Sequence, residues 1–325
     1  MTLEQRPATT VQWLRRKTKD GLARLVMPLT RACIRRLPFV RAKQAVWDLF
    51  VVRHLWWREF DFAARTRLGV KIVGNTSDPI QRFIYYFGVW EPNLTALISE
   101  RLKPGDVFVD VGANIGYFSL LAAKLVGSPG KVVAIEASPE AFHRLERNLR
   151  CNRARNVRAV NVAVSDCEED LQFYAAPENE SGRTTAEPSL ANHEHFVPSF
   201  RMRALPLALI LSKEEVKGAR LMKIDVEGYE WPVLLGLVPM LEACRSDLEV
   251  VVEVTPSALA RRNVKCADLL GLFGARGFHP YRLNNEYTPK SYLLWERPAR
   301  PVRLKQWQFT EQEDLVFSRL DREML

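Results

Sequence analysis

Two acidic residues and a glycine-containing segment between them form a pattern that suits a nucleoside ligand. Asp110 lies in the apolar segment Val107 to Val111, and Gly112-Ala113-Asn114-Ile115-Gly116 follows directly. Glycines at such a turn permit positive φ angles and let a ligand approach the main-chain N–H groups at a helix N-terminus. Glu136 ends the next apolar segment, Lys131 to Glu136. An acid at this point of an α/β fold accepts hydrogen bonds from ribose hydroxyls.

The spacing of the glycines indicates which nucleoside. A dinucleotide site needs Gly-x-Gly-x-x-Gly to accommodate pyrophosphate, and here Asn114 occupies the middle position. This substitution argues against an NAD-linked oxidoreductase. The methionine part of S-adenosylmethionine carries an ammonium and a carboxylate and no phosphate, so Asp110 suits its amino group. We therefore expect S-adenosylmethionine as the cofactor, although a glycine loop that only turns the chain is the simpler alternative.

A second set of carboxylates stands where the chemistry of methyl transfer would need it. The reaction is an in-line displacement, so the protein must align the acceptor and remove its proton. Asp225, Glu227 and Glu253 follow or end two later apolar segments. We expect Asp225 beside the methionine part or the acceptor, with Glu227 or Glu253 as the base. Two alternatives stay open: Glu227 caps a helix that begins near Tyr229, or a divalent metal binds Asp225 and Glu253, although no feature demands a metal.

The segments that carry these residues alternate between strand and helix patterns. Helices are expected over Tyr117 to Leu125 and over Pro139 to Asn152, where Ser138 is a suitable N-cap. Asp78 to Glu100 is expected to be helical with a break at Gly88 to Pro92. The expected strands are Val70–Val73, Val107–Val111, Lys131–Glu136, Val157–Val164, Leu221–Val226 and Leu248–Val254. Strands joined by helical crossovers form a parallel sheet, with the ligand at their carboxyl ends.

The last part of the chain predicts an antiparallel element. Phe278 to Leu283 and Tyr292 to Trp295 flank a polar turn at residues 284–286, which suggests a hairpin at the sheet edge. The predicted fold is α/β: a class I methyltransferase (Rossmann-like) fold with a mostly parallel seven-stranded sheet, a C-terminal antiparallel hairpin and an N-terminal helical extension. The predicted division is residues 1–69 for the basic extension, 70–300 for the catalytic domain and 301–325 for a tail.

The extension has its own composition. Residues 1–67 hold 15 lysines and arginines against 5 acidic residues, whereas the remaining 258 residues hold 32 against 33. Helices are expected over Val11–Leu25, Leu29–Leu37 and Val40–Arg67. Tryptophans lie among these arginines, at positions 13, 47, 56 and 57. One interpretation is a helical cap that buries them, a second is peripheral contact with an anionic membrane, and a third is a surface facing nucleic acid.

Composition excludes several other classes. The five cysteines are scattered without a Cys-x-x-Cys pair, which disfavours a structural zinc site or a disulfide framework. The apolar runs are shorter than the roughly 20 residues that span a bilayer. With no recognisable secretory signal, we expect a cytoplasmic location, either free or peripheral at the inner membrane surface. The oligomeric state is not predicted.

A long polar segment, Pro177 to Ser199, separates the third and fourth expected strands. Such an insertion is commonly a lid or a binding loop. His193 and His195 lie in it and are candidate bases because an unperturbed imidazole titrates near pH ~6.5. Ser181-Gly182-Arg183-Thr184-Thr185 could bind a polar acceptor or fold over the cofactor. A solvated loop is the plain alternative for both.

Several segments together resemble the FkbM family of methyltransferases. They are Gly88–Pro92, Phe108–Phe118, Ile135–Pro139, Lys223–Glu230 and Val252–Glu253, and the resemblance covers about residues 78–297. With this resemblance added, the residues expected to contact the cofactor are Glu91, Asp110, Gly112, Ala113, Asn114, Gly116, Glu136, Ala137 and Asp225.

The resemblance implies methylation of an oxygen, usually on a sugar, a polyketide or another secondary metabolite. We therefore expect a small-molecule or glycan acceptor, including a lipid-linked sugar. Methylation of nucleic-acid bases is disfavoured, because Asp225-Val226-Glu227-Gly228 stands where those enzymes commonly have Asp/Asn-Pro-Pro-Tyr/Phe. An RNA ribose methyltransferase and a non-catalytic binding protein of the same fold are the remaining alternatives.

Overall fold

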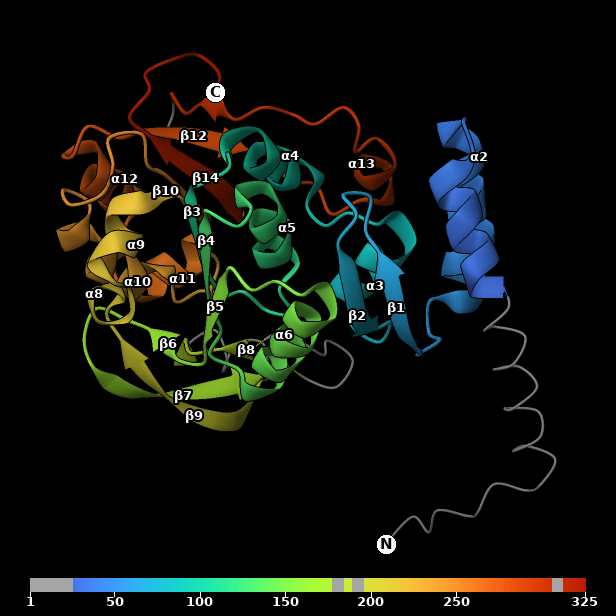
Figure 1. Cartoon of the computed structure of the whole chain (residues 1–325), viewed down its shortest axis with the longest axis horizontal. Helices are drawn as coiled ribbons and strands as arrows, with labels where there is room; N and C mark the ends of the chain where they lie inside the picture. Colours follow the sequence, from blue (N-terminus) through green and yellow to red (C-terminus); the bar gives the residue numbers. More distant parts are fainter. Residues whose placement is uncertain (1–25, 177–183, 189–195, 306–311) are drawn as a thin grey trace, which may run out of the picture.

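Five apolar segments form the parallel part of a large twisted sheet (Figure 1). The computed structural model describes residues 26–176, 184–188, 196–305 and 312–325. Neighbouring strands pair in parallel in the order β11-β10-β3-β4-β5. Their bounds are β3 (Val107–Val111), β4 (Lys131–Ile135), β5 (Val157–Val160), β10 (Ala219–Ile224) and β11 (Glu249–Val254). The predicted parallel core is therefore confirmed.

The far edge of the sheet is antiparallel, as expected, but its second strand comes from a different segment. Strand β14 (Glu313–Ser318) pairs antiparallel with both β11 and β12 (His279–Leu283), and so lies between them. The two-residue strand β13 (Val302–Arg303) adds an eighth edge strand among the described residues. Part of the segment expected as a tail thus completes the sheet.

The strand expected at Tyr292 to Trp295 was wrong. Helix α13 (Pro289–Leu293) occupies part of this segment. Pro289 stands at the first helical position, and the Thr288 side chain accepts a hydrogen bond from the Ser291 amide at 3.4 Å. These helix-start signals outweigh the aromatic and aliphatic residues that suggested a strand.

Helices cover both faces of the sheet because successive strand residues point to opposite sides. Phe108 packs in one apolar cluster and Val109 in the other. The first face carries α3 (Pro79–Phe87), α4 (Pro92–Arg101), α5 (Tyr117–Val126) and α6 (Pro139–Asn152). The second carries α8 (Leu207–Ile210), α9 (Lys213–Gly218), α10 (Glu230–Leu237), η3 (Val238–Met240), α11 (Pro256–Arg261) and α12 (Cys266–Gly274).

The long connection between β5 and β10 builds a second sheet. Its order is β6-β9-β7-β8, with bounds β6 (Ala163–Val164), β7 (Glu169–Ala175), β8 (Thr184–Thr185) and β9 (Val197–Leu205). The single strand expected over Val157 to Val164 is therefore divided between the two sheets. His193, His195 and residues 181–183 lie outside the described residues.

Among the described residues of the N-terminal region, those from 26 to 55 are mainly helical. Residues 26–36 are helical, followed by α2 (Val40–Val46) and the π-helix η1 (Trp47–Leu55). The prediction that this helix continues to Arg67 was wrong, because β1 (Asp61–Arg65) is a strand that pairs antiparallel with β2 (Lys71–Asn75). Every second residue of β1 is buried, which is the pattern of a strand with one face packed inward and not that of a helix. The expected helix Val11–Leu25 lies outside the described residues.

Arginine side chains connect this region to the α/β domain by hydrogen bonds. The Arg35 guanidinium donates to the carbonyl oxygens of Ile84, Tyr85 and Tyr86 at 3.0–3.2 Å, and Arg31 donates to that of Tyr85 at 2.8 Å. These oxygens belong to the last turn of α3, where the Gly88 amide also donates to that of Ile84 at 2.9 Å and no further helical turn follows. The positive charges also suit the negative end of the helix dipole.

Among the described residues, none of the helices has the length and apolar composition that a bilayer crossing requires.

Candidate active site

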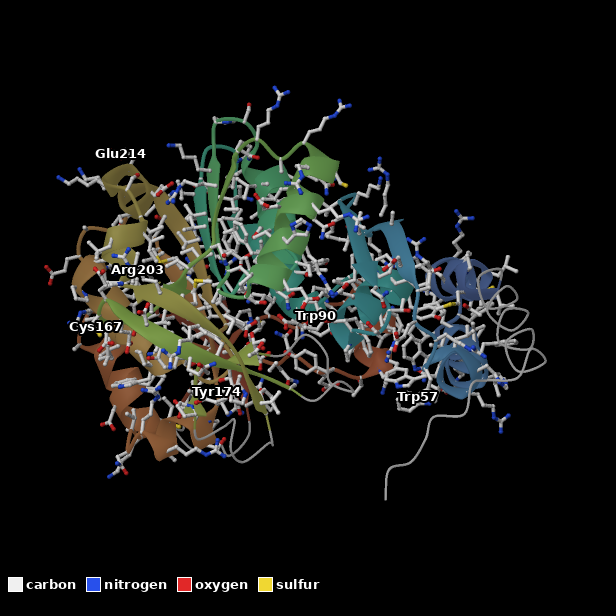
Figure 2. The ribbon with its side chains drawn as sticks, turned by 90° about the horizontal axis from the view of Figure 1, so that it is seen from below. Trp57, Trp90, Cys167, Tyr174, Arg203 and Glu214 are labelled. Atoms are coloured by element: carbon white, nitrogen blue, oxygen red, sulfur yellow. The ribbon has the colours of Figure 1, made fainter. Side chains whose placement is uncertain are left out.

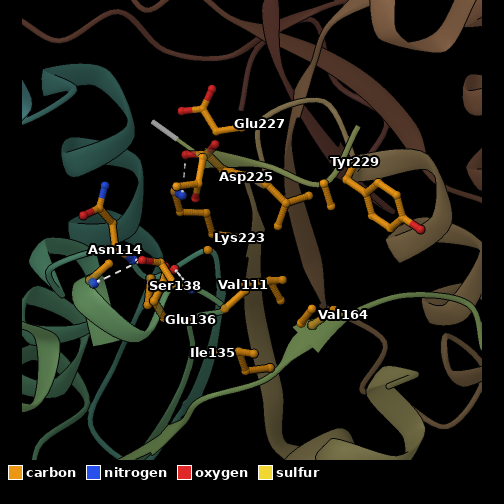
Figure 3. A pocket seen from close by; sticks show the side chains of 18 of the residues that line it. Val111, Asn114, Ile135, Glu136, Ser138, Val164, Lys223, Asp225, Glu227 and Tyr229 are labelled. Carbon is orange, nitrogen blue, oxygen red and sulfur yellow. Dashed lines mark hydrogen bonds and ion pairs between the residues drawn. The ribbon is translucent and has the colours of Figure 1, made fainter. Parts of the chain in front are cut away.

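A pocket opens at the carboxyl ends of β3, β4 and β10 (Figure 3), where a doubly wound sheet binds its ligands. It contains about 1040 Å³ of empty space, part of it open to solvent. The loops after these three strands form one part of the wall. The second sheet supplies another part through Leu171, Phe173, Thr184 and Ala186.

Gly112 brings the ends of β3 and β10 into direct contact. Its φ is +78°, and a Cβ placed on it would lie 1.8 Å from the carbonyl oxygen of Asp225. The Asp225 amide in turn donates to the carbonyl oxygen of Val111 at 3.1 Å. No side chain fits between the two backbones, so glycine is required here for both its conformation and its size.

The amides of the glycine loop are already used within the protein. Gly112 and Ala113 both donate to the carbonyl oxygen of Ile135, at 2.9 and 3.0 Å, and Gly116 donates to that of Ala113 at 2.9 Å. The Asn114 amide donates to Glu136 Oε2 at 2.7 Å. The loop therefore bounds the pocket without offering these four amides to a ligand, unlike the arrangement that the sequence suggested.

Glu136 lies in the pocket wall with both carboxylate oxygens fixed. Besides the Asn114 amide, the Ser138 amide donates to its Oε1 at 2.8 Å. Burial raises the pKa of Glu136 to about 7, although the two amide hydrogen bonds act in the opposite direction. Each oxygen keeps a further lone pair, so Glu136 can accept hydrogen bonds from a ligand diol. Ala137 lies beside it in the wall.

Asp110 and Gly116 stand behind the pocket and do not line it. The Ser119 hydroxyl donates to Asp110 Oδ2 at 2.5 Å, and within the described part of the chain Oδ1 is buried without a hydrogen-bond donor. Burial raises the pKa of Asp110, and the nearby Lys223 partly offsets this effect. Gly116, with φ +88°, precedes α5 and packs against Leu145. The structure therefore places Glu136, and not Asp110, directly at the cavity.

Lys223 and Asp225 form an ion pair in the opposite wall, with Lys223 Nζ 2.8 Å from Asp225 Oδ2 (Figure 3). Burial alone would lower the pKa of Lys223, but the carboxylates of Asp225, Asp110 and Glu91 outweigh it and raise the pKa above its usual range. Lys223 is thus a cation and not a base. Lys223 begins one of the segments that resemble the FkbM family, but it was not among the residues expected to bind the cofactor or to act in catalysis.

Glu227 also lines the pocket and has a left-handed backbone conformation, with φ +53°. The turn that precedes α10 is held by Glu230, whose Oε1 accepts hydrogen bonds from the amides of Val226 and Gly228, both at 3.0 Å. The N-cap residue of α10 is Tyr229, whose side chain makes no capping hydrogen bond, so Glu227 does not stand at the capping position considered for it. Thr185 supports the same turn by donating its hydroxyl to the carbonyl oxygen of Glu227 at 2.6 Å.

Three further carboxylates lie near Asp225 and Glu227, outside the pocket wall. Glu91 accepts a hydrogen bond from the Tyr287 hydroxyl at 3.1 Å, Asp314 accepts one from the Asn285 side chain at 2.7 Å, and Glu253 accepts one from Gln312. We call Glu91, Asp225, Glu227, Glu253 and Asp314 the acidic cluster.

The members of the acidic cluster act on one another. Burial raises the pKa of Glu91, Glu253 and Asp314, and the neighbouring carboxylates raise it further. The pKa of Asp314 is raised to about 7. Within the described ranges, the three-residue group whose potential metal ligands converge is Asp166, Cys167 and Glu169, and the acidic cluster contains no such group.

Comparisons with known proteins agree on the kind of domain. Residues 110–280 match the family described as the Methyltransferase FkbM domain. Hexuronic acid methyltransferase AglP of Haloferax volcanii is 27% identical over 168 residues, which are 50% of this chain and 62% of that protein. Protein-L-isoaspartate O-methyltransferase 2 of Archaeoglobus fulgidus is 34% identical over 139 residues, 40% of this chain and 61% of that protein. The match thus spans less than two thirds of either relative.

A solved structure also aligns with the chain. It is the methyltransferase FkbM from Methylobacillus flagellatus KT, with a TM-score of 0.37 and 15% sequence identity. The alignment covers 69% of this chain and 50% of that one.

Proposed function

The chain belongs to the FkbM family of methyltransferases, and on that premise we propose that it methylates a hydroxyl of an uncharged sugar or a similar polyhydroxyl acceptor. Its fold is that of class I methyltransferases, whose cofactor is S-adenosylmethionine. The observation that carries the proposal is one pocket that joins Glu136 on one wall to Lys223, Asp225 and Glu227 on the other. The first wall and the ion pair of the second wall suit the cofactor, and the part of the second wall around Glu227 suits the acceptor.

The first wall fits the nucleoside. Glu136 can accept hydrogen bonds from both ribose hydroxyls, and Ile135, Val162 and Val164 add apolar surface suited to a purine. Asp110 lies behind this wall and does not reach the cavity, and its carboxyl group is held by the Ser119 hydroxyl. When bound, S-adenosylmethionine supplies a methyl group made electrophilic by its positively charged sulfur.

The ion pair between Lys223 and Asp225 fits the amino-acid end of the cofactor. That end carries one ammonium and one carboxylate, and the pair offers one partner of each sign at the pocket wall. Because Lys223 is buried, its charge is held in position with little screening by water, whereas the half-buried Asp225 stays open to the pocket. We therefore assign Lys223 and Asp225 to binding and orientation.

The acidic cluster favours an acceptor without negative charge. Asp225 and Glu227 line this side of the pocket, with Glu91, Glu253 and Asp314 behind them. The raised pKa values of Glu91, Glu253 and Asp314 indicate that further negative charge is disfavoured here, so an anionic acceptor would bind less well than a neutral one. A sugar hydroxyl, in contrast, donates hydrogen bonds to carboxylates. The name of the Haloferax relative points to a sugar acid as its acceptor. For this chain we propose the sugar class and not the acidic form.

Glu227 is the proposed base. A hydroxyl becomes nucleophilic enough when a carboxylate takes its proton during attack. Glu227 lines the pocket and Glu253 does not, although burial and the charges of Asp225 and Glu227 raise the pKa of Glu253. Glu253 therefore contributes to the charge around the acceptor, whereas Glu227 can reach the acceptor oxygen.

The test combines cofactor binding with transfer of a labelled methyl group. Calorimetry should show binding of S-adenosylmethionine, and neutral glycans should accept label in preference to uronic acids. Glu227→Gln should lower kcat by about 100-fold or more and leave the cofactor Kd unchanged. Glu214→Gln, on the exposed surface of α9, is the matched control. Absence of cofactor binding would refute the function, and preference for uronic acids would refute the neutral acceptor alone.

A further inference from the structure

The N-terminal helices expose a group of large apolar side chains. Six of the twelve large hydrophobic residues that are exposed in the described part of the chain lie between residues 29 and 57. Four of them, Leu49, Phe50, Val52 and Trp57, belong to η1 or follow it directly, and Trp57 is 83% exposed. Single exposed apolar residues are ordinary on a protein surface, but such a concentration marks an interaction site.

The two sides of η1 differ in their surroundings. Trp47, Val51 and Leu55 are buried, four residues apart, and the Trp47 ring packs against Phe83 and Phe87 of α3 at centroid distances of 5.6 and 4.7 Å. Leu49, Arg53 and Trp57 follow the same spacing two residues later and are exposed. They therefore lie on the opposite side of the helical segment.

The tryptophans thus divide between two interpretations. Trp47 and Trp56 pack into the protein and act as a cap, with their rings 6.1 Å apart, edge to face. Trp57 points outward at the end of the molecule formed by the N-terminal helices (Figure 2). We call Leu49, Phe50, Val52, Arg53 and Trp57 the outer face of η1.

Exposed basic residues outnumber acidic ones on the N-terminal helices. Arg53 lies within the outer face, Arg36 and Arg41 are exposed on the adjoining helices, and Asp48 is the exposed acid of η1. The first 67 residues contain 15 basic and 5 acidic residues, whereas the rest of the chain is nearly balanced. Apolar side chains interleaved with arginines suit a surface that is anionic outside and apolar beneath.

We propose that the outer face of η1 docks on a lipid bilayer with anionic headgroups. Trp57, Leu49 and Phe50 enter the boundary between headgroups and acyl chains, while Arg53 pairs with lipid phosphates. This inference is independent of the acceptor proposed above.

The composition of the face distinguishes a bilayer from other occupants. Leu49 and Val52 gain nothing from the phosphates or base edges of a nucleic acid, but they gain free energy by leaving water for lipid. A second copy of the chain, docked through the same face about a two-fold axis, would bring Arg53 and the surrounding positive charge against their equivalents. An anionic bilayer satisfies both components of the face.

The connection to the catalytic domain makes such docking directional. Arg31 and Arg35 bind the last turn of α3, and Gly88 to Glu91 follow that turn on the way to the acidic cluster. A Cβ on Gly88 would lie 2.5 Å from Arg35 Nη2, so this contact is close. The pocket is therefore held in a fixed orientation relative to the docked face.

The test is co-sedimentation of the full chain with vesicles. Vesicles of phosphatidylglycerol and phosphatidylcholine in equal parts should bind the protein, and vesicles of phosphatidylcholine alone should bind it weakly. The variant L49S/F50S/W57S should lose at least about tenfold in partitioning, because three large apolar side chains no longer leave water for lipid. Arg53→Glu should lose several-fold, and high salt should weaken binding of the unaltered chain.

The controls separate docking from unfolding and from other partners. Leu209→Ser alters an equally exposed residue on α8 and should leave partitioning unchanged. All variants should keep the circular dichroism and melting temperature of the parent, since the replaced side chains are exposed. The proposal is overturned if the triple variant partitions like the parent, if vesicle charge has no effect, or if the same substitutions abolish dimerisation or RNA binding in a chain that ignores vesicles.

Discussion

The two walls of the pocket are built by different means. On the cofactor side, most interactions involve the backbone. Gly112 contacts the backbone of Asp225, and the carbonyl oxygen of Ile135 accepts hydrogen bonds from two amides. Two further amides donate to the carboxylate of Glu136. On the acceptor side, charged side chains from distant segments set the geometry and the electrostatics. The comparison indicates that the first wall tolerates almost no change of shape, whereas the second depends on a balance of charge.

Gly112→Ala should break the cofactor wall and give the largest effect. The added Cβ would lie 1.8 Å from a backbone oxygen, so β3 and β10 would have to separate at their carboxyl ends. We expect a loss of cofactor affinity above about 100-fold and a loss of stability of about 2–4 kcal/mol. Calorimetry and urea unfolding would measure the two.

Two glycine controls identify the cause. Gly105→Ala meets open space at φ +93° and should show only the backbone penalty of roughly 1 kcal/mol. Gly271→Ala, in helix α12 with open space around it, should be neutral or stabilising by up to about 1 kcal/mol. Equal behaviour of Gly112→Ala and Gly105→Ala would show that the close backbone contact is unimportant.

Lys223→Met tests the charge balance of the second wall, which holds the ion pair with Asp225, and should give the next largest effect. It removes the partner of Asp225 and leaves buried carboxylates uncompensated, at an expected cost of about 3 kcal/mol. The additional change Asp225→Asn should recover part of the stability, because it also removes a negative charge. Urea unfolding of the single and double variants measures this coupling, and Lys217→Met on the exposed side of α9 is the control. Simple additivity of the two changes would contradict the assigned pair.

Glu136→Gln should give the smallest effect and sharpen the comparison through its pH dependence. An ionised Glu136 accepts ribose hydrogen bonds more strongly than a protonated one. Because its pKa is about 7, cofactor affinity of the parent should rise by roughly tenfold between about pH 6 and about pH 8. The Gln variant should bind about tenfold more weakly at high pH and show a flat profile. An unchanged slope would assign the titration to another group.

The raised pKa of Glu136 also makes the stability of the ligand-free protein depend on pH. This stability falls as the pH rises, whereas the expected cofactor affinity increases. The folded pKa of Glu136 is above the ordinary value of 4.5, so the folded state holds this proton more tightly than the unfolded state does. The resulting stabilisation is present below pH 4.5 and is lost as the pH rises through about 7. Burial also raises the pKa of Glu230 and of Asp314 to about 7, so both groups likewise lower the stability of the fold as the pH rises.

Local signals made part of the fold predictable. Pro139 to Asn152 is the helix that was expected, and Ser138 accepts the Ala141 amide at 3.3 Å as its N-cap. The break after α3 was also expected, since Gly88 ends this helix at φ +78°. In each case the information lies within a few residues, where capping and backbone conformation decide the outcome.

Pairing between distant segments was harder to predict. Burial alternates along the five residues of β1. In the sequence these residues directly follow a helical pattern, which we expected to continue to Arg67. Strand β14 is a short apolar run whose place between β11 and β12 depends on partners that are more than twenty residues away. Such pairings follow from the whole sheet and not from local propensity.

The candidate site follows the same division. Gly112 and Asn114 lie in one loop, Glu136 directly follows the next strand of the sheet, and all three line the pocket. Lys223 and the contact between Glu91 and Tyr287 were missed, since the latter joins residues 196 positions apart. Burial of a charged side chain is decided by partners that no local spacing reveals.

The position of β14 also has a consequence for biosynthesis. During translation β11 and β12 emerge before residues 313–318, and until those residues arrive the two strands lack the neighbour that joins them. The nascent chain therefore presents two open strand edges to other polypeptides at the ribosome. Slow synthesis through residues 284–312 would prolong this interval, so recovery of native protein should depend on translation speed there and on chaperones that shield unpaired strands.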